Sequence, residues 1–247
     1  MMEQKVLHIS VASLKRLSIT NSKIYSCKPK IYSCKLNISS PNLQSLTYNG
    51  MPQDVHTDHT FSSIVDADID ITFQDLRYTE KGKERQCGLK NLLGGISDVK
   101  ILHVSGSTLL TLYYEDIFTQ MPTFHDLRQL VVSSELRLSM YVGLLRLLSI
   151  LPNVESVVIT QASPSENYFS GFGLPECSLL QLKVVEIREI DWKDLGMIDN
   201  ILKISPALQT MTIAFLSSLS QCRRDRVKEK ILRLPKGSPC CLISFLE

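Results

Sequence analysis

The sequence predicts an α/β solenoid, with parallel strands on one side and helices on the convex side. A short pattern, with apolar residues at its first, fourth and sixth positions, recurs along the chain. It starts at Leu14, Leu43, Ile64, Val99, Leu127, Val154, Leu182 and Leu208. The starts lie 29, 21, 35, 28, 27, 28 and 26 residues apart, and the irregular pair of 21 and 35 amounts to two periods of 28. Such a regular spacing indicates one repeated structural unit.

Each unit supplies one strand with two inward positions. The last two apolar residues of the pattern differ by two, so both point to the same face of a strand. A strand, a helix and two turns in about 28 residues have the period of a leucine-rich repeat, and stacked repeats bury their apolar faces against one another. We therefore expect an irregular leucine-rich-repeat solenoid with buried pairs on neighbouring parallel strands. These pairs are Leu17 and Ile19, Leu130 and Val132, Val157 and Ile159, and Val185 and Ile187.

The segments between the strands contain helical patterns. Leucines recur at helical spacing over 138–151, and apolar residues do so over 195–204. Pro122, Pro152 and Pro206 follow such stretches, where proline ends a helix. The Asn or Cys that leucine-rich repeats usually carry three residues after the strand pattern is absent, which is why we expect an irregular solenoid. These positions hold Ser22, Met51, Thr72, Ser107, Glu135, Ala162, Ile190 and Leu216.

The composition is that of a globular intracellular protein. The 247 residues are 44% hydrophobic and 21% charged, with a formal net charge of +2. Such a balance gives no indication of a nucleic-acid or membrane partner. The seven cysteines are scattered, which favours reduced thiols in the cytoplasm or nucleus.

The C-terminal motifs resemble the FBD domain of plant F-box/leucine-rich-repeat proteins. They are Leu-Lys-Val-Val-Glu-Ile at 182–187, Ser-Pro-Ala-Leu-Gln-Thr-Met-Thr-Ile at 205–213 and Ser-Pro-Cys-Cys-Leu-Ile-Ser-Phe at 238–245. Helical segments at 192–202 and around 223–233 separate them, in the order that the family has. The resemblance implies a repeat solenoid over 1–160, a linker or loop over 161–176, and an FBD domain over 177–247 that continues and caps the solenoid.

The resemblance also implies a function without catalysis. The family is similar to substrate receptors of cullin-RING ubiquitin ligases, in which the F-box binds a Skp adaptor and the repeats hold a target protein. The pattern already starts at Leu14, so we expect that this chain lacks the F-box and does not bind the adaptor. Its target is unknown. The alternative is a truncated or degenerate fragment with no independent function.

One strand stands out as a candidate binding site. Asp66, Asp68 and Asp70 alternate with apolar residues, so the three carboxylates should lie on one face. They fit either an acidic ladder for a basic partner or an ordinary solvated strand face. A calcium loop would need Gly and Glu where Ile71 and Arg77 stand.

The remaining candidates have simpler interpretations. His56 and His59 lie in a polar stretch without enough further ligands for zinc, and Cys27 and Cys34 belong to a short duplication. Adjacent residues of an extended strand point to opposite faces, so Cys240 and Cys241 should not pair. The basic stretch is expected to be the exposed face of a capping helix, with Val227, Ile231 and Leu234 packed inward; its cations are Arg223, Arg224, Arg226, Lys228, Lys230 and Arg233. We predict no enzyme activity, metal or cofactor.

Overall fold

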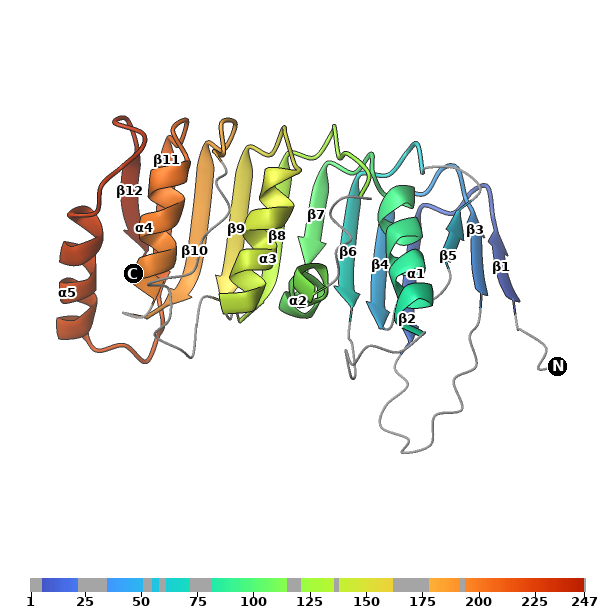
Figure 1. Ribbon diagram of the computed structural model, residues 1–247, viewed down its shortest axis with the longest axis horizontal. Coiled ribbons are helices and arrows are strands. Elements are labelled where there is room, and N and C mark those ends of the chain that lie inside the picture. Colours follow the sequence, from blue (N-terminus) through green and yellow to red (C-terminus); the bar gives the residue numbers. More distant parts are fainter. Residues whose placement is uncertain are drawn as a thin grey trace.

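The chain forms one long parallel sheet with a second layer on one of its faces. The computed structural model describes residues 6–21, 35–50, 55–57, 61–71, 81–114, 121–135, 138–161, 178–191 and 194–246. The nine-stranded sheet has the order β12-β11-β10-β9-β8-β7-β6-β4-β2. Its strands are β2 (Arg16–Asn21), β4 (Ser45–Gly50), β6 (Asp66–Ile71), β7 (Ile101–Val104), β8 (Gln129–Glu135), β9 (Ser156–Gln161), β10 (Val184–Ile190), β11 (Thr210–Phe215) and β12 (Leu242–Leu246). Figure 1 shows them side by side in chain order.

The second layer changes from strands to helices along the chain. It starts with a three-stranded parallel sheet of β1 (Val6–Ser10), β3 (Lys35–Ser39) and β5 (Val55–Thr57). It continues with α1 (Lys81–Gly95), α2 (Gly106–Tyr114), α3 (Leu138–Ser149), α4 (Leu195–Ile204) and α5 (Gln221–Leu232). In Figure 1, α1, α3 and α4 lie across the near face of the long sheet. This arrangement confirms the predicted α/β solenoid of the leucine-rich-repeat type.

The length of each unit explains why the first units have strands in the second layer. Ser45 of β4 lies opposite Asp66 of β6, only 21 residues on, whereas Ile101 of β7 lies opposite Gln129 of β8, 28 residues on. An extended chain advances about 3.3 Å per residue and a helix about 1.5 Å, so an extended segment crosses the same layer with fewer residues. The short unit therefore returns through β5, and the longer units have room for a helix.

The spacing of the apolar pattern is the register of the sheet. Leu130 lies opposite Val157, which lies opposite Val185, and the corresponding row is Val132, Ile159 and Ile187. All six side chains are buried, which confirms these pairs. The prediction for Leu17 and Ile19 is wrong in degree, because both are only partly buried. They belong to β2, which has a neighbour on one side only within the described sheet.

The predicted helices are present, with small shifts at their ends. The pattern over 138–151 gives α3, which ends at Ser149, and the pattern over 195–204 gives α4 with the predicted bounds. Ile198, Ile201 and Leu202 of α4 are buried, whereas Leu195 is partly exposed. In α5, Val227 and Ile231 are buried and Leu234, just beyond the helix, is partly buried, as the capping-helix interpretation requires.

The turns before the strands are joined by a repeated backbone contact. The carbonyl of the residue just before a strand accepts two N–H groups from the next unit. For example, the Lys100 carbonyl accepts those of Arg128 (2.9 Å) and Gln129 (3.1 Å), and the Arg128 carbonyl accepts those of Glu155 (2.9 Å) and Ser156 (3.0 Å). The same contact recurs at Lys15, Gln44, Val65, Glu155 and Lys183. These bonds join the units although the usual Asn or Cys ladder is absent from the sequence.

The sheet is continuous across the predicted domain boundary, because β10 pairs directly with β9. The linker predicted at 161–176 lies outside the described residues apart from Gln161, the last residue of β9. The division into 1–160, 161–176 and 177–247 stays a prediction.

Candidate partner-binding face

The face of the long sheet opposite the core is its open face, which we define by the outward residues of β2, β4 and β6 to β12. On β4, Ser45 and Thr47 alternate with the buried Leu46 and Tyr48. The same alternation of partly exposed and buried residues holds on the other strands wherever burial is described. The second layer lies on the buried side, so the open face presents side chains from nine consecutive strands.

The three aspartates lie on this face, as the alternation predicts. Asp66, Asp68 and Asp70 form an acidic ladder on β6, where Ala67, Ile69 and Ile71 are buried. The Ser45 hydroxyl donates a hydrogen bond of 2.6 Å to Asp66 Oδ2, and Asn49 Nδ2 donates one of 3.1 Å to Asp70 Oδ2.

Asp68, between them, is exposed. Neighbours on β4 therefore orient the two outer carboxylates, and the middle one faces solvent. Partner binding by the ladder stays a prediction.

An apolar strip lies beside the acidic ladder. Its members are Ile101 of β7, Val131 of β8, Val158 of β9 and Val184 of β10. Val131 lies directly opposite Val158, while Ile101 and Val184 lie two residues before the register partners of these valines. The first three are partly exposed and Val184 is 40% exposed. The sequence analysis missed this strip, although β-branched apolar residues at outward strand positions were its visible signal.

The surroundings of the strip differ at its two ends. Ile101 lies opposite Asp66, and His103 lies opposite Asp68, so the acidic ladder borders the strip at β6. At the other end Val184 lies opposite Thr210, which is uncharged. Glu186 of β10 lies next to the strip, but Arg188 Nε contacts its Oε1 at 2.6 Å. The only unpaired concentration of charge that borders the described strip is therefore acidic and lies at β6.

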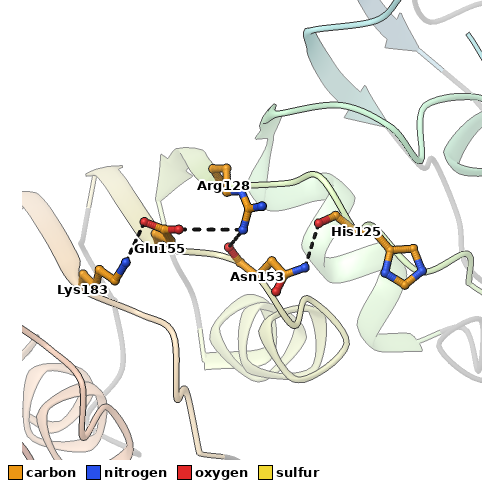
Figure 2. Close-up of polar contacts among 5 residues, drawn as sticks. All are labelled: His125, Arg128, Asn153, Glu155 and Lys183. Atoms are coloured by element: carbon orange, nitrogen blue, oxygen red, sulfur yellow. Dashed lines mark hydrogen bonds and ion pairs between the residues drawn. The ribbon is translucent and has the colours of Figure 1, made fainter. Parts of the chain in front are cut away.

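A polar rim runs along the edge of the sheet where β8 to β10 begin. Figure 2 shows Glu155 between two cations, with Lys183 Nζ 3.0 Å from Oε2 and a guanidinium nitrogen of Arg128 3.8 Å from Oε1. The same group of Arg128 donates to the Asn153 carbonyl at 3.4 Å. All three charged side chains are between 39% and 53% exposed, so the rim is solvated and the pairs add little stability.

Asn153 joins this rim to the preceding unit. Its Nδ2 donates to the His125 carbonyl at 2.8 Å, as Figure 2 shows, and Asn42 Nδ2 donates to the Ala12 carbonyl at 2.8 Å in the same way. Both asparagines follow a proline and precede the first apolar residue of the pattern. The sequence analysis missed this contact, and the recurring Pro-Asn dipeptide was its signal.

The basic helix α5 packs at the last strands of the sheet. Lys228 Nζ lies 5.7 Å and 5.6 Å from the ring centroids of Phe215 and Phe245, and these two rings are stacked. Arg224 donates to the carbonyls of Ser217 and Leu219 in the loop before the helix. These two cations therefore have structural contacts.

The other residues considered from the sequence do not assemble into a site in the described structure. His56 lies in β5, whose side chains are not described, and His59, Cys27 and Cys34 lie outside the described residues. Among described positions, no three His, Cys, Asp or Glu side chains form a group suited to a metal ion. No helix in the described part of the chain is long and apolar enough to cross a bilayer.

Cys240 and Cys241 point in different directions, as expected. Cys240 is exposed and Cys241 is buried, and both are free thiols. Burial raises the pKa of the Cys241 thiol, and the charge of Lys236 opposes this rise.

The fold and its open face define the chain as a leucine-rich-repeat protein with a surface suited to holding another protein. Sequence comparisons specify the relatives. The chain is 28% identical to a putative F-box/LRR-repeat protein of Arabidopsis thaliana over 97% of its own length and 42% of the relative. It is 26% identical to a putative F-box/FBD/LRR-repeat protein of the same plant, over 85% of the chain and 49% of the relative.

A third relative, an F-box/LRR-repeat protein of Arabidopsis thaliana, is 32% identical over 60% of the chain and 30% of its own length. The chain is thus a homologue of the plant F-box/LRR/FBD proteins, which confirms the resemblance seen in its C-terminal motifs. It spans about half the length of the first two curated relatives. No protein-family model matches the chain, and no solved structure matches it significantly.

Proposed function

We propose that the chain is a non-enzymatic protein-interaction module that holds a target protein on its open face, in the manner of the substrate-recognition part of a ubiquitin-ligase receptor. The observation that carries the proposal is the open face itself, where nine strands present partly exposed side chains on one continuous surface. A solenoid collects contacts from several units on such a face. The names of the relatives, which join an F-box to leucine-rich repeats, support the ubiquitin-ligase context.

Within this proposal the acidic ladder attracts a basic part of the partner. Asp68 is exposed and Asp66 and Asp70 are held in place by Ser45 and Asn49. Three carboxylates on one strand steer an oppositely charged partner and set its position, because charge complementarity contributes more to specificity and association rate than to affinity. No catalytic step forms part of the proposal.

Charge reversal tests the role of the ladder. Replacing Asp66, Asp68 and Asp70 together by Lys should remove basic interactors from affinity captures analysed by quantitative mass spectrometry, and should leave the circular dichroism spectrum unchanged. A variant with Asp126, Asp225 and Glu229 replaced by Lys is the matched control, because these exposed acids lie away from the open face. Equal capture by both variants would show that the ladder is only a solvated strand face.

The ubiquitin-ligase context has its own test. Residues 1–247 alone should not co-elute with a purified Skp adaptor, since none of the contacts on the open face requires one. A fusion that places an F-box from a relative before Met1 should bring a captured partner into one complex with the adaptor. Co-elution of the unfused chain with the adaptor would contradict the assignment of this chain to target binding alone.

The alternative of a degenerate fragment makes a different prediction. A fragment without independent structure should unfold gradually in urea and should capture no partner. The described core is contiguous from Leu36 to Cys241, which favours a single cooperative transition.

A further inference from the structure

The apolar strip is the part of the open face that has no structural explanation. Outward residues of a solvated sheet face are usually polar, yet Ile101, Val131, Val158 and Val184 follow one another across four neighbouring strands. The inward residues of the same strands are already buried in the core, so the strip adds nothing to the packing of the second layer. An apolar strip on an otherwise polar surface indicates a place where another molecule is bound.

The length of the strip sets the size of what binds there. Neighbouring strands lie about 4.8 Å apart, so the three intervals from β7 to β10 measure roughly 14 Å. An extended peptide covers that length with about four or five residues. The strip therefore suits a short extended segment that lies across the strands and places two or three aliphatic side chains on it.

The charges around the strip fix the orientation of that segment. At β6 the strip meets Asp66 and Asp68, and no cation pairs with them within the described residues. Along the strand-start edge it meets the rim, where Lys100 and Arg128 are exposed and would repel a cation. The opposite end, at Thr210, is uncharged. A basic side chain is thus favoured at the β6 end and disfavoured beside the middle of the strip.

We infer that the open face binds an extended segment of a partner protein in which aliphatic residues lie next to one or more Lys or Arg residues at one end. This inference rests on the proposed function and specifies the chemistry of the partner. The aliphatic side chains cover the apolar strip, and the basic end reaches the acidic ladder. An acidic segment is excluded by the ladder, and a segment that is basic throughout is disfavoured by the rim.

Peptide selection tests the inference without knowledge of the natural partner. A library of random twelve-residue peptides is displayed on phage and selected on the immobilised full chain. The enriched sequences should share aliphatic residues within five positions and Lys or Arg on one side of them. Enrichment of acidic peptides, or of aliphatic peptides without a basic end, would overturn the inference.

The strongest selected peptide is then synthesised with a fluorophore, and its Kd is measured by anisotropy. Val158→Thr, which keeps the shape of the side chain, and Asp68→Asn should each weaken binding at least about fivefold. Val11→Thr and Asp126→Asn are the matched controls, since both residues are exposed away from the strip, and they should change the Kd less than about twofold. Equal effects of strip and control variants would overturn the inference.

A further variant separates this inference from the proposed function. Val158→Lys places a charge in the middle of the open face and should abolish binding through that face. Peptides that lose binding to Val158→Lys but lack the basic and aliphatic pattern would leave the proposed function standing and overturn the inference about the partner. Selected peptides that bind Val158→Lys as tightly as the unchanged chain would contradict both.

Discussion

At the scale of single residues, Thr108 shows how one buried hydroxyl joins two neighbouring units. Its side chain is fully buried at the start of α2. Oγ1 accepts the N–H of Ile71 and donates to the carbonyl of Ile69, both at 2.9 Å, at the end of β6. The Ser105 hydroxyl in turn accepts the N–H of Thr108 at 3.1 Å, in the manner of a helix N-cap. Thr108 therefore satisfies backbone groups that the helix and the strand leave open.

Replacing Thr108 by Val removes this hydroxyl and keeps the shape of the side chain. The N–H of Ile71 would lose its partner in the core, which costs about 1–3 kcal/mol of unfolding free energy. Thr212→Val is the control, because that hydroxyl is partly exposed and contacts Ser244 Oγ at 3.2 Å; it should change stability by less than about 0.5 kcal/mol. Urea unfolding measures both, and equal losses would contradict the role given to Thr108.

The neighbouring thiols at the C-terminal end should differ in reactivity. Burial raises the pKa of Cys241, so it forms less thiolate at a given pH than exposed Cys240 does. We expect iodoacetamide at pH 8 to modify Cys240 in the folded chain and to leave Cys241 largely unmodified, as fragmentation of the tryptic peptide would show. Addition of urea should remove the difference. Equal modification in the folded state would contradict the burial of Cys241.

At the scale of elements, two helical glycines should respond to the same substitution with opposite signs. A Cβ added at Gly143 of α3 would meet the carbonyl oxygen of Leu109 in α2 at less than contact distance. A Cβ added at Gly94 of α1 would have no atom within 4 Å. Gly143 is thus required for the close approach of α2 and α3, and Gly94 has no such role.

Gly94→Ala should therefore stabilise the chain by about 0.5–1 kcal/mol, the usual gain of Ala over Gly in a helix. Gly143→Ala should destabilise it by about 1–3 kcal/mol, because backbone atoms of α2 would have to move. Thermal unfolding followed by circular dichroism at 222 nm compares the two variants. A stabilised Gly143→Ala would show that α2 and α3 do not pack as closely as the structure has them.

The elements also show which features the sequence could predict. The apolar pattern predicts the register of the long sheet, because the interval between repeated residues is also the interval between paired strands. It does not predict the second layer of the first units, since whether a strand or a helix closes a unit depends on how many residues are left after the strand. Nor does it predict Thr108, whose partners Ile69 and Ile71 are more than 30 residues away.

For the candidate site, the sequence predicted the outward direction of Asp66, Asp68 and Asp70 from alternation alone. The apolar strip was not predicted, because Val131 and Val158 belong to different units and only the register of β8 and β9 brings them together. The partly exposed Leu17 and Ile19 were mispredicted for a related reason. Their burial depends on whether β2 has a second neighbour, and a local pattern contains no information on that.

At the scale of the whole molecule, the two faces of the sheet should tolerate a charge very differently. Ile159 is fully buried and its neighbour Val158 lies on the open face. Ile159→Asp should unfold the chain, since an unpaired buried carboxylate costs several kcal/mol against a total stability of about 5–15 kcal/mol. Val158→Asp should keep the fold. Circular dichroism and gel filtration compare them, and a folded Ile159→Asp would contradict the assignment of the core.

The most direct test of the open face as the binding surface is site-specific photo-crosslinking. A photoreactive phenylalanine placed at His103 or Thr212, on the open face, should form covalent adducts with the captured partner. The same residue placed at Arg146, on the exposed side of α3, should form none. Adducts from both open-face positions alone are the predicted result. Adducts from Arg146 without any from His103 and Thr212 would contradict the account, because the partner would then lie on the helices.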